Sequence, residues 1–245
     1  ILKVMFNTPL RCLFMGFKFF WSRVSRIWKP SGLVIAVLGT DGAGKSTIIS
    51  AIVPVLAAAT HGSVVLKHLR PGFLPPLARF KGIRQEQAGP MANPHGSKPS
   101  GFVGSLFRLV YAMGDYFIGY WVLIWPKIAK VPSAVVVFDR YAYDMFLDPK
   151  RFRIGLPGKL ISWFCQLAPK PDIILCLYAS ASIVALRKQE LPLEEVVRQT
   201  SVLREFAMTN SRAVLISTED TVDETRDRVL LAVRQYCATR TGIGF

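Results

Sequence analysis

The feature that most constrains this chain is a glycine-rich run at residues 39–46, Gly-Thr-Asp-Gly-Ala-Gly-Lys-Ser. It follows a wholly apolar run at residues 33–38, which predicts a short strand buried on both faces. Residues 45 to about 59 predict a helix. Glycines at this spacing let successive backbone N–H groups surround a phosphate, and the positive end of the following helix adds to the attraction. The sequence therefore predicts a phosphate-binding loop between a central strand and a helix.

Two side chains of this loop have the chemistry of nucleotide binding. Lys45 is expected to reach the β- and γ-phosphates of ATP, and Ser46 is expected to offer its hydroxyl to Mg²⁺. The residues predicted to hold the nucleotide are Gly39, Asp41, Gly42, Ala43, Gly44, Lys45, Ser46 and Thr47. ATP and Mg²⁺ are therefore the predicted cofactors.

The rest of the chain alternates between apolar strand patterns and helical patterns. Further strands are expected at 63–68, 134–138, 172–178 and 213–217, with helices at about 158–168, 180–189, 193–208 and 221–238. This alternation predicts a three-layer α/β fold, a five-stranded parallel sheet covered by helices on both faces. One domain over residues 31–245 accounts for the 245-residue chain. Residues 70–101 are rich in proline and glycine and predict a long irregular segment on the substrate side.

A long apolar pattern at residues 102–130 predicts a helix. Its uncharged part, residues 116–125, is too short to cross a bilayer. A helix in the core is the preferred interpretation, and a helix at a membrane interface is the alternative.

A second charged motif, Asp139-Arg140-Tyr141, ends the strand at 134–138. Ligands of parallel sheets bind at the carboxyl ends of the strands. Asp139 could hold Mg²⁺ there or orient the attacking oxygen, and Arg140 could bind a phosphate with two N–H groups. A strand end followed by a helix cap is the alternative interpretation.

The segment at about 187–198 contains Arg187, Lys188 and Arg198. A mobile cationic lid at this place would neutralise charge on the transferred phosphoryl group and exclude water. Two helices joined by a loop with solvated charges would explain the same pattern.

The positive charge is concentrated in one half of the chain. Residues 1–130 carry 16 Lys and Arg against three acids, whereas residues 131–245 carry 15 against 13. A basic half favours anionic partners. Nucleic acid is the less favoured partner, because no recognisable nucleic-acid-binding motif accompanies the charge.

Residues 1–30 contain Phe and Trp at helical spacing with Lys and Arg between them, and no acid. This basic amphipathic N-terminal segment suits an anionic membrane surface. Alternatively, it packs on its own domain or on a preceding region.

The four scattered cysteines form no metal-binding spacing and are expected to be reduced.

The two motifs together resemble the thymidylate kinase family of P-loop kinases. The resemblance rests on the run from Gly39 to Thr47, on Phe138-Asp-Arg-Tyr141 and on an arginine-containing segment before a Glu-rich helix, and it covers roughly residues 33–240. It implies roles for Asp139 and Arg140 in binding Mg²⁺ and the acceptor phosphate. It also implies that Arg187 is the catalytic lid arginine, helped by Lys188 and Arg198. Members of the family are commonly dimers, so a homodimer is expected.

The acceptor side departs from the family pattern. The family usually has Ala-Asp-Arg where this chain has Gly114-Asp115-Tyr116, and that arginine contacts thymine. The family's Arg-Glu-Pro-Gly turn is reduced here to Arg70-Pro-Gly. The residues expected to bind the acceptor are Arg70, Asp115, Arg140 and Tyr141. The altered motifs also resemble thymidylate-kinase-like proteins encoded among bacterial surface-polysaccharide genes.

The resemblance predicts an ATP-dependent kinase acting on a nucleoside monophosphate, with thymidylate the leading acceptor. The alternative acceptor is a sugar or lipid-linked glycan at the cytoplasmic face of the membrane, and a P-loop NTPase that binds nucleic acid is a third hypothesis. A cytoplasmic location is expected, and peripheral attachment to the inner face of the membrane is the alternative to a freely cytoplasmic protein.

Overall fold

A computed structural model describes residues 15, 16, 18, 30–77, 100–131, 133–187 and 192–242. Most of the N-terminal segment, the greater part of the predicted irregular segment and the centre of the predicted lid lie outside the described residues. Lys188 and Cys12 are among them. The predictions for these parts stay predictions.

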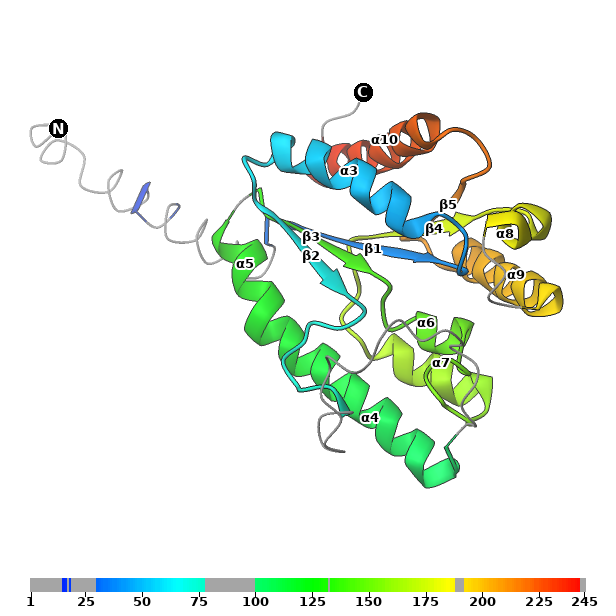
Figure 1. The fold of residues 1–245 in the computed structure, drawn as a ribbon. Helices are drawn as coiled ribbons and strands as arrows, with labels where there is room; N and C mark the ends of the chain where they lie inside the picture. Colours follow the sequence, from blue (N-terminus) through cyan, green and yellow to red (C-terminus); the bar gives the residue numbers. More distant parts are fainter. Residues whose placement is uncertain are drawn as a thin grey trace, which may run out of the picture.

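The centre of the molecule is a five-stranded, wholly parallel sheet (Figure 1). The strands are β1 Leu33–Gly39, β2 Val64–His68, β3 Val135–Asp139, β4 Ile173–Tyr178 and β5 Ala213–Ser217. Their spatial order is β2-β3-β1-β4-β5. All five strands predicted from the sequence are therefore present, and the predicted α/β fold class is confirmed.

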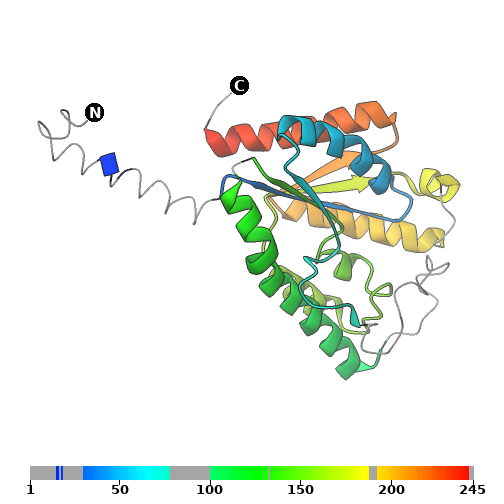
Figure 2. The same cartoon turned by 60° about the vertical axis from the view of Figure 1, so that its left-hand side comes forward.

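Helices cover both faces of this sheet (Figures 1 and 2). On one face lie α3 Lys45–Ala59 and α10 Val222–Thr241. On the other lie α4 Phe102–Gly119, α6 Asp144–Leu147, α7 Gly158–Gln166 and α9 Leu193–Thr209, and α8 Ala181–Arg187 contacts α9. Successive side chains of β1 alternate between the two faces: Leu33 and Ile35 face α3, whereas Val34 and Ala36 face the other layer. The apolar run therefore supplies both halves of the core at once.

The long helix expected at 102–130 is interrupted. A π-helical turn, η3 Tyr120–Ile124, separates α4 from α5 Trp125–Lys130. Pro126 stands in the first turn of α5, and because it has no N–H, the regular ladder of helical hydrogen bonds cannot continue through it.

One side of α4 packs in the core and the other is apolar but exposed. Leu109 and Tyr116 are fully buried. The exposed apolar side chains of α4 and η3 are Phe102, Val103, Phe107, Val110, Phe117, Ile118, Trp121 and Val122, which together form the outer face of α4–η3. The prediction of a core helix at 102–130 is thus right only for the side of α4 that contains Leu109 and Tyr116. Within the part of the chain that the structure describes, no helix is long and apolar enough to cross a membrane.

Candidate functional site

The glycine-rich loop connects the end of β1 to the start of α3. Gly39 is required by close approach, because a Cβ there would lie 2.5 Å from the carbonyl oxygen of Leu177. Gly44 has a φ of 77°, in the left-handed region that favours glycine. No side-chain hydrogen bond caps α3, and its first turn contains no acid. The positive end of this helix is therefore directed at whatever anion enters the loop.

Lys45 is buried against its own loop. Its Nζ donates to the carbonyl oxygens of Gly39 at 2.8 Å and of Thr40 at 2.7 Å. Burial, together with the charge of Arg140, lowers the pKa of Lys45 to about 8, although Asp41 opposes this shift. To bind a phosphate, Nζ must exchange these carbonyls for phosphate oxygens, which are stronger acceptors.

Asp41 joins three cations. Arg140 and Arg151 each donate to one of its carboxylate oxygens, and Nζ of Lys45 lies 3.6 Å from it. Burial alone would raise the pKa of Asp41, but Lys45, Arg140 and Arg151 together hold it well below its usual range. The carboxylate thus stays ionised and links the loop to two guanidinium groups.

Arg140 lies where β3 passes the loop. Its backbone N–H donates to Val37 at 3.0 Å, and its φ of 72° is unusual for a residue other than glycine. Besides Asp41, its guanidinium faces the buried Asp144 at 3.9 Å. Burial would lower the pKa of Arg140, but Asp144 and Asp41 raise it; burial also raises the pKa of Asp144. The site is therefore a buried network in which acids and bases alternate.

Asp139 ends β3 with one oxygen engaged and the other unsatisfied. Its Oδ2 lies 3.1 Å from Nδ1 of His68, whereas its buried Oδ1 has no hydrogen-bond partner among the described residues. Burial would raise the pKa of Asp139, but His68 and Lys45 lower it. An ionised, unsatisfied oxygen beside a phosphate-binding loop fits a role toward Mg²⁺. No three potential metal ligands gather among the described residues, so Mg²⁺ would depend on Ser46, phosphates and water for most of its ligands.

Asp115, predicted to bind the acceptor, supports the chain around it. It is fully buried and accepts hydrogen bonds from the backbone N–H groups of Gly72 at 3.2 Å and Leu74 at 2.7 Å. Arg70 pairs with it at 3.6 Å. Tyr116, at the position of the family's base-contacting arginine, is also buried and donates to the carbonyl oxygen of Leu69. Both residues therefore fix the path of the chain after β2.

Tyr141 likewise lies in the core rather than in the site. It is 1% exposed, its hydroxyl donates to Pro169, and its ring stacks edge-on against Tyr116 at 4.8 Å. Its side chain thus packs in the core, and the role of Tyr141 in binding the acceptor stays a prediction.

A cavity of about 140 Å³ opens beside this supported segment. It is lined by Leu69, Arg70, Pro76, Leu77, Arg108, Tyr111, Ala112, Met145, Phe152 and Ile154. Its volume is several times the share of one water molecule, about 30 Å³, so it admits a ring-sized group. Arg108 brings a positive charge to it, whereas the charge of Arg70 is paired with Asp115, and Tyr111 and Phe152 offer ring faces. Sequence reasoning missed all of these except Arg70, since no local motif links them.

Arg187 reaches the glycine-rich loop from the end of α8. Its guanidinium donates to the carbonyl oxygen of Thr218 at 2.8 Å, and a Cβ built on Gly44 would lie 3.7 Å from its Nη1. Thr218 in turn donates to Ala43 at 3.0 Å. The predicted lid arginine thus lies beside the loop. Arg198 instead donates to Glu195 and to Leu147.

The site and sheet together define the class: this chain has the fold of the P-loop kinases. Among solved structures it is similar to thymidylate kinase from Ehrlichia chaffeensis, with a TM-score of 0.57 and 17% identity over 83% of this chain and 100% of that one. It is also similar to thymidylate kinase from Candida albicans, with a TM-score of 0.58 and 15% identity over 84% of this chain and 93% of that one. The fold is therefore thymidylate kinase-like. No family model and no curated protein matches the sequence.

Proposed function

We propose that this protein is a kinase that transfers the γ-phosphoryl group of ATP to a nucleoside monophosphate, with thymidylate the first acceptor to test. The observation that carries the proposal is the network in which Asp41 of the glycine-rich loop holds Arg140 and Arg151. It brings two guanidinium groups to the loop that would bind ATP, and Arg151 is next in sequence to Phe152, which lines the cavity that would bind the acceptor. Phosphoryl transfer depends mainly on such positioning and charge neutralisation.

The residues have distinct proposed roles. Lys45 and the loop N–H groups hold the β- and γ-phosphates, while Ser46 and Asp139 hold Mg²⁺, which neutralises phosphate charge when bound. Arg140 and Arg151 hold the acceptor phosphate, and Arg187 approaches the γ-phosphate from the lid. Each arginine suits an anion, because a guanidinium offers several N–H donors in one plane.

An aromatic, anionic acceptor fits the cavity near Arg108 and Tyr111. Its cations suit a phosphate and its rings suit a base. Since Tyr116 replaces the arginine that contacts thymine in the family, selectivity for thymine is expected to be weak. The Candida albicans enzyme is described as having broad substrate specificity.

The test is ADP release measured with each common nucleoside monophosphate, with and without Mg²⁺. We expect turnover with at least one pyrimidine monophosphate, and only in the presence of Mg²⁺. Lack of turnover with every nucleoside monophosphate would remove this proposal.

A second candidate keeps the same phosphoryl donor but uses a lipid-linked glycan at a membrane surface. The outer face of α4–η3 favours it, because that face is apolar and is followed directly by the exposed cations Lys127 and Lys130. The chain also enters the domain there, since the N–H of Gly32 donates to Ile128 at 3.1 Å. The basic N-terminal segment would thus attach near the same end as these cations, an arrangement that suits an anionic bilayer.

Vesicle flotation with anionic and neutral lipids tests this second candidate. Binding to anionic vesicles should fall on deletion of residues 1–30 and again with Phe117→Ser and Trp121→Ser. Sedimentation of the same variants tests the contrary explanation. If the substitutions abolish a homodimer and leave flotation unchanged, the outer face of α4–η3 is a subunit interface.

A further inference from the structure

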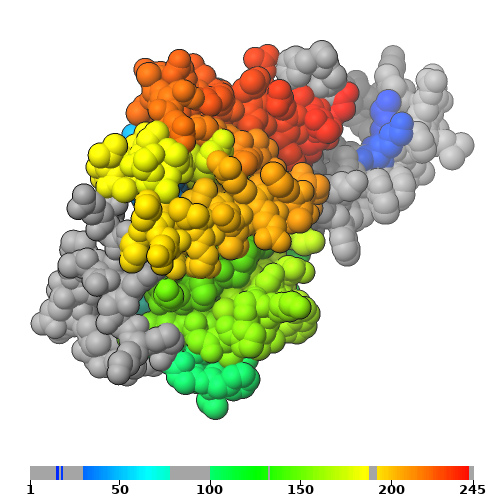
Figure 3. All heavy atoms as spheres, turned by 90° about the vertical axis from the view of Figure 1, so that its right-hand side faces the viewer, coloured from blue at the N-terminus to red at the C-terminus, as the bar shows by residue number. Residues whose placement is uncertain are grey.

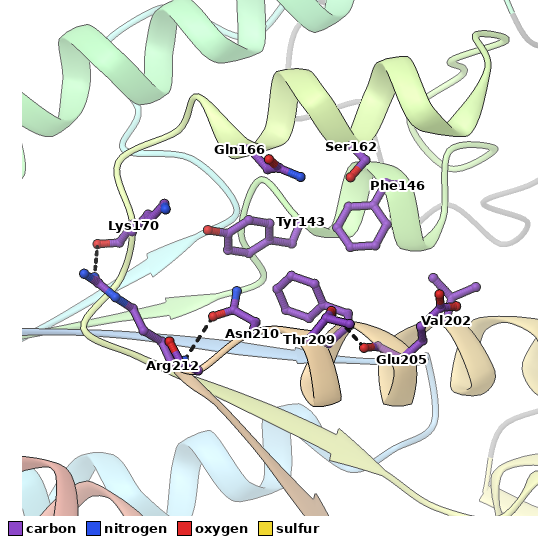
Figure 4. A pocket seen from close by; sticks show the side chains of 12 residues that line it. Tyr143, Phe146, Ser162, Gln166, Lys170, Val202, Glu205, Thr209, Asn210 and Arg212 are labelled. Carbon is purple, nitrogen blue, oxygen red and sulfur yellow. Dashed lines mark hydrogen bonds between the residues drawn. The ribbon is translucent and has the colours of Figure 1, made fainter.

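A second pocket, of about 710 Å³, lies between α6 and α7 on one side and α9 on the other (Figure 4). Figure 3 shows α7 and α9 next to each other on one face of the molecule. The pocket is lined by Tyr143, Phe146, Ser162, Gln166, Lys170, Val202, Glu205, Phe206, Thr209, Asn210, Ser211 and Arg212. None of these residues belongs to the phosphoryl-transfer site.

One end of the pocket lies at the opposite end of the sheet from that site. Lys170 precedes β4 and Arg212 precedes β5, so both lie at the amino ends of their strands. The glycine-rich loop, Asp139 and Thr218 all follow the carboxyl ends. A molecule in the pocket would therefore occupy a site of its own.

Three aromatic rings form one wall. The centroid of Phe206 lies 4.9 Å from that of Tyr143 and 5.4 Å from that of Phe146. They come from different elements, since Phe146 belongs to α6 and Phe206 to α9. Together with Val202 they offer a surface on which a flat apolar body can stack.

Hydrogen-bond donors gather at one end of this wall. Tyr143 is 3% exposed, and its hydroxyl has no hydrogen-bond partner among the described residues. Figure 4 shows this hydroxyl directed into the pocket, toward the end where Lys170 and Arg212 lie. Burial raises the pKa of Tyr143 to about 12, so the hydroxyl keeps its proton and can donate it. Because it lines the pocket, this hydroxyl is open to an acceptor on a ligand.

The charges are separated along the pocket. Lys170 and Arg212 lie at the end near the Tyr143 hydroxyl, and Glu205 lies at the other end with Val202 (Figure 4). The guanidinium of Arg212 is held in place by the carbonyl oxygen of Pro171, at 2.9 Å. The donor end is thus cationic, and an anionic group is the acceptor that suits it.

We propose that this pocket binds a small molecule with an aromatic body and a single carboxylate or phosphate, the ring against Phe206 and the anion near Tyr143 and Lys170. The proposal does not depend on the kinase function. It rests on the unpartnered hydroxyl, the aromatic wall and the cations at the same end of the pocket.

Calorimetric titration with 1-naphthylacetate tests it, with 1-naphthyl phosphate as a second arm that identifies the preferred anion. ATP is present at saturation, so that the glycine-rich loop is occupied. We expect saturable binding of one equivalent. The neutral analogue 2-(1-naphthyl)ethanol should bind at least tenfold more weakly.

Three variants locate the site. Tyr143→Phe keeps the ring and removes the hydroxyl, so affinity should fall about tenfold, as for loss of a hydrogen bond to a charged group. Lys170→Gln, at an exposed position that cannot disturb the core, should weaken binding about threefold. Lys159→Gln is the matched control on α7, because Lys159 is exposed and does not line the pocket; it should change nothing.

Three results would overturn the proposal: absence of saturable binding, equal affinity for the neutral analogue, or the same affinity in wild type, Tyr143→Phe and Lys170→Gln. The unfolding midpoint of each variant, measured in parallel, shows that the variants are folded.

Discussion

The proposed phosphate-donor side and the proposed acceptor side of the site are built in different ways. The donor side is almost continuous in sequence: the loop between β1 and α3 supplies its backbone groups and Lys45. The acceptor cavity takes its lining from three separate segments, around Arg70, Arg108 and Phe152. Asp41 of the donor loop pairs with Arg140, which follows β3. A site made from one stretch of chain can be recognised as a motif, whereas a site assembled by folding cannot.

The largest effect should come from the donor side. Lys45→Ala removes the ammonium group that would contact the transferred phosphate, and we expect turnover to fall by at least about 10³-fold. ADP release under saturating ATP measures it, with Lys159→Ala as the control. Turnover within about tenfold of wild type would refute the kinase proposal.

Asp139→Asn should lower kcat by about 10²-fold, because the unsatisfied Oδ1 is the oxygen proposed to face Mg²⁺. The amide keeps the shape but loses the charge. Titration of activity against Mg²⁺ should show a higher requirement in the variant. If the Mg²⁺ dependence were unchanged, Asp139 would serve only to contact His68 and not to hold Mg²⁺.

Alkaline pH should weaken ATP binding to the free protein. With the pKa of Lys45 lowered to about 8, most of its charge is present at pH 7 and lost at pH 9, so the Kd for ATP should rise about tenfold across this range. The lowered pKa of Lys45 has the opposite effect on folding stability, which increases with pH. The unfolded chain keeps its Lys45 proton up to its ordinary value of 10.5, so stability rises with pH between about 8 and that value. A Kd that stays constant to pH 9 would contradict the lowered pKa.

The acceptor side should respond separately from the donor side. Arg108→Gln removes a cation from the acceptor cavity, so the KM for the nucleoside monophosphate should rise about fivefold while the KM for ATP stays the same. Equal changes in both KM values would mean that the two halves are not independent.

The smallest effect is expected from Tyr116→Phe. It deletes the part-buried hydrogen bond to the carbonyl oxygen of Leu69, so the free energy of unfolding should fall by about 1 kcal/mol. The acceptor KM should rise about twofold, because the chain after β2 loses a support. Thermal unfolding and initial rates measure the two effects, and a change in the KM for ATP alone would contradict the assignment.

The features that could be predicted from the sequence are those formed by one continuous stretch of chain. All five strands were predicted, since parallel strands buried on both faces appear as apolar runs. The donor loop and the position of Arg187 near it were likewise predictable. Arg151, Asp144 and Arg108 were missed because they meet the site only through the turns around α6 and the direction of α4. Asp115 was identified as a site residue, but its charge is used to hold backbone N–H groups, a role that depends on the fold of a distant segment.

Left-handed backbone conformations follow the ends of β2 and β3, and they limit which substitutions these positions can accept. Arg140 has a φ of 72°, Leu69 has a φ of 60°, and the N–H of Leu69 donates to Asp139 at 2.8 Å. Such conformations cost side-chain-bearing residues about 1–2 kcal/mol each. A glycine at position 69 would relieve this strain, but it would also remove the leucine side chain from the wall of the proposed acceptor cavity. Thermostability and acceptor recognition are thus opposed at this position.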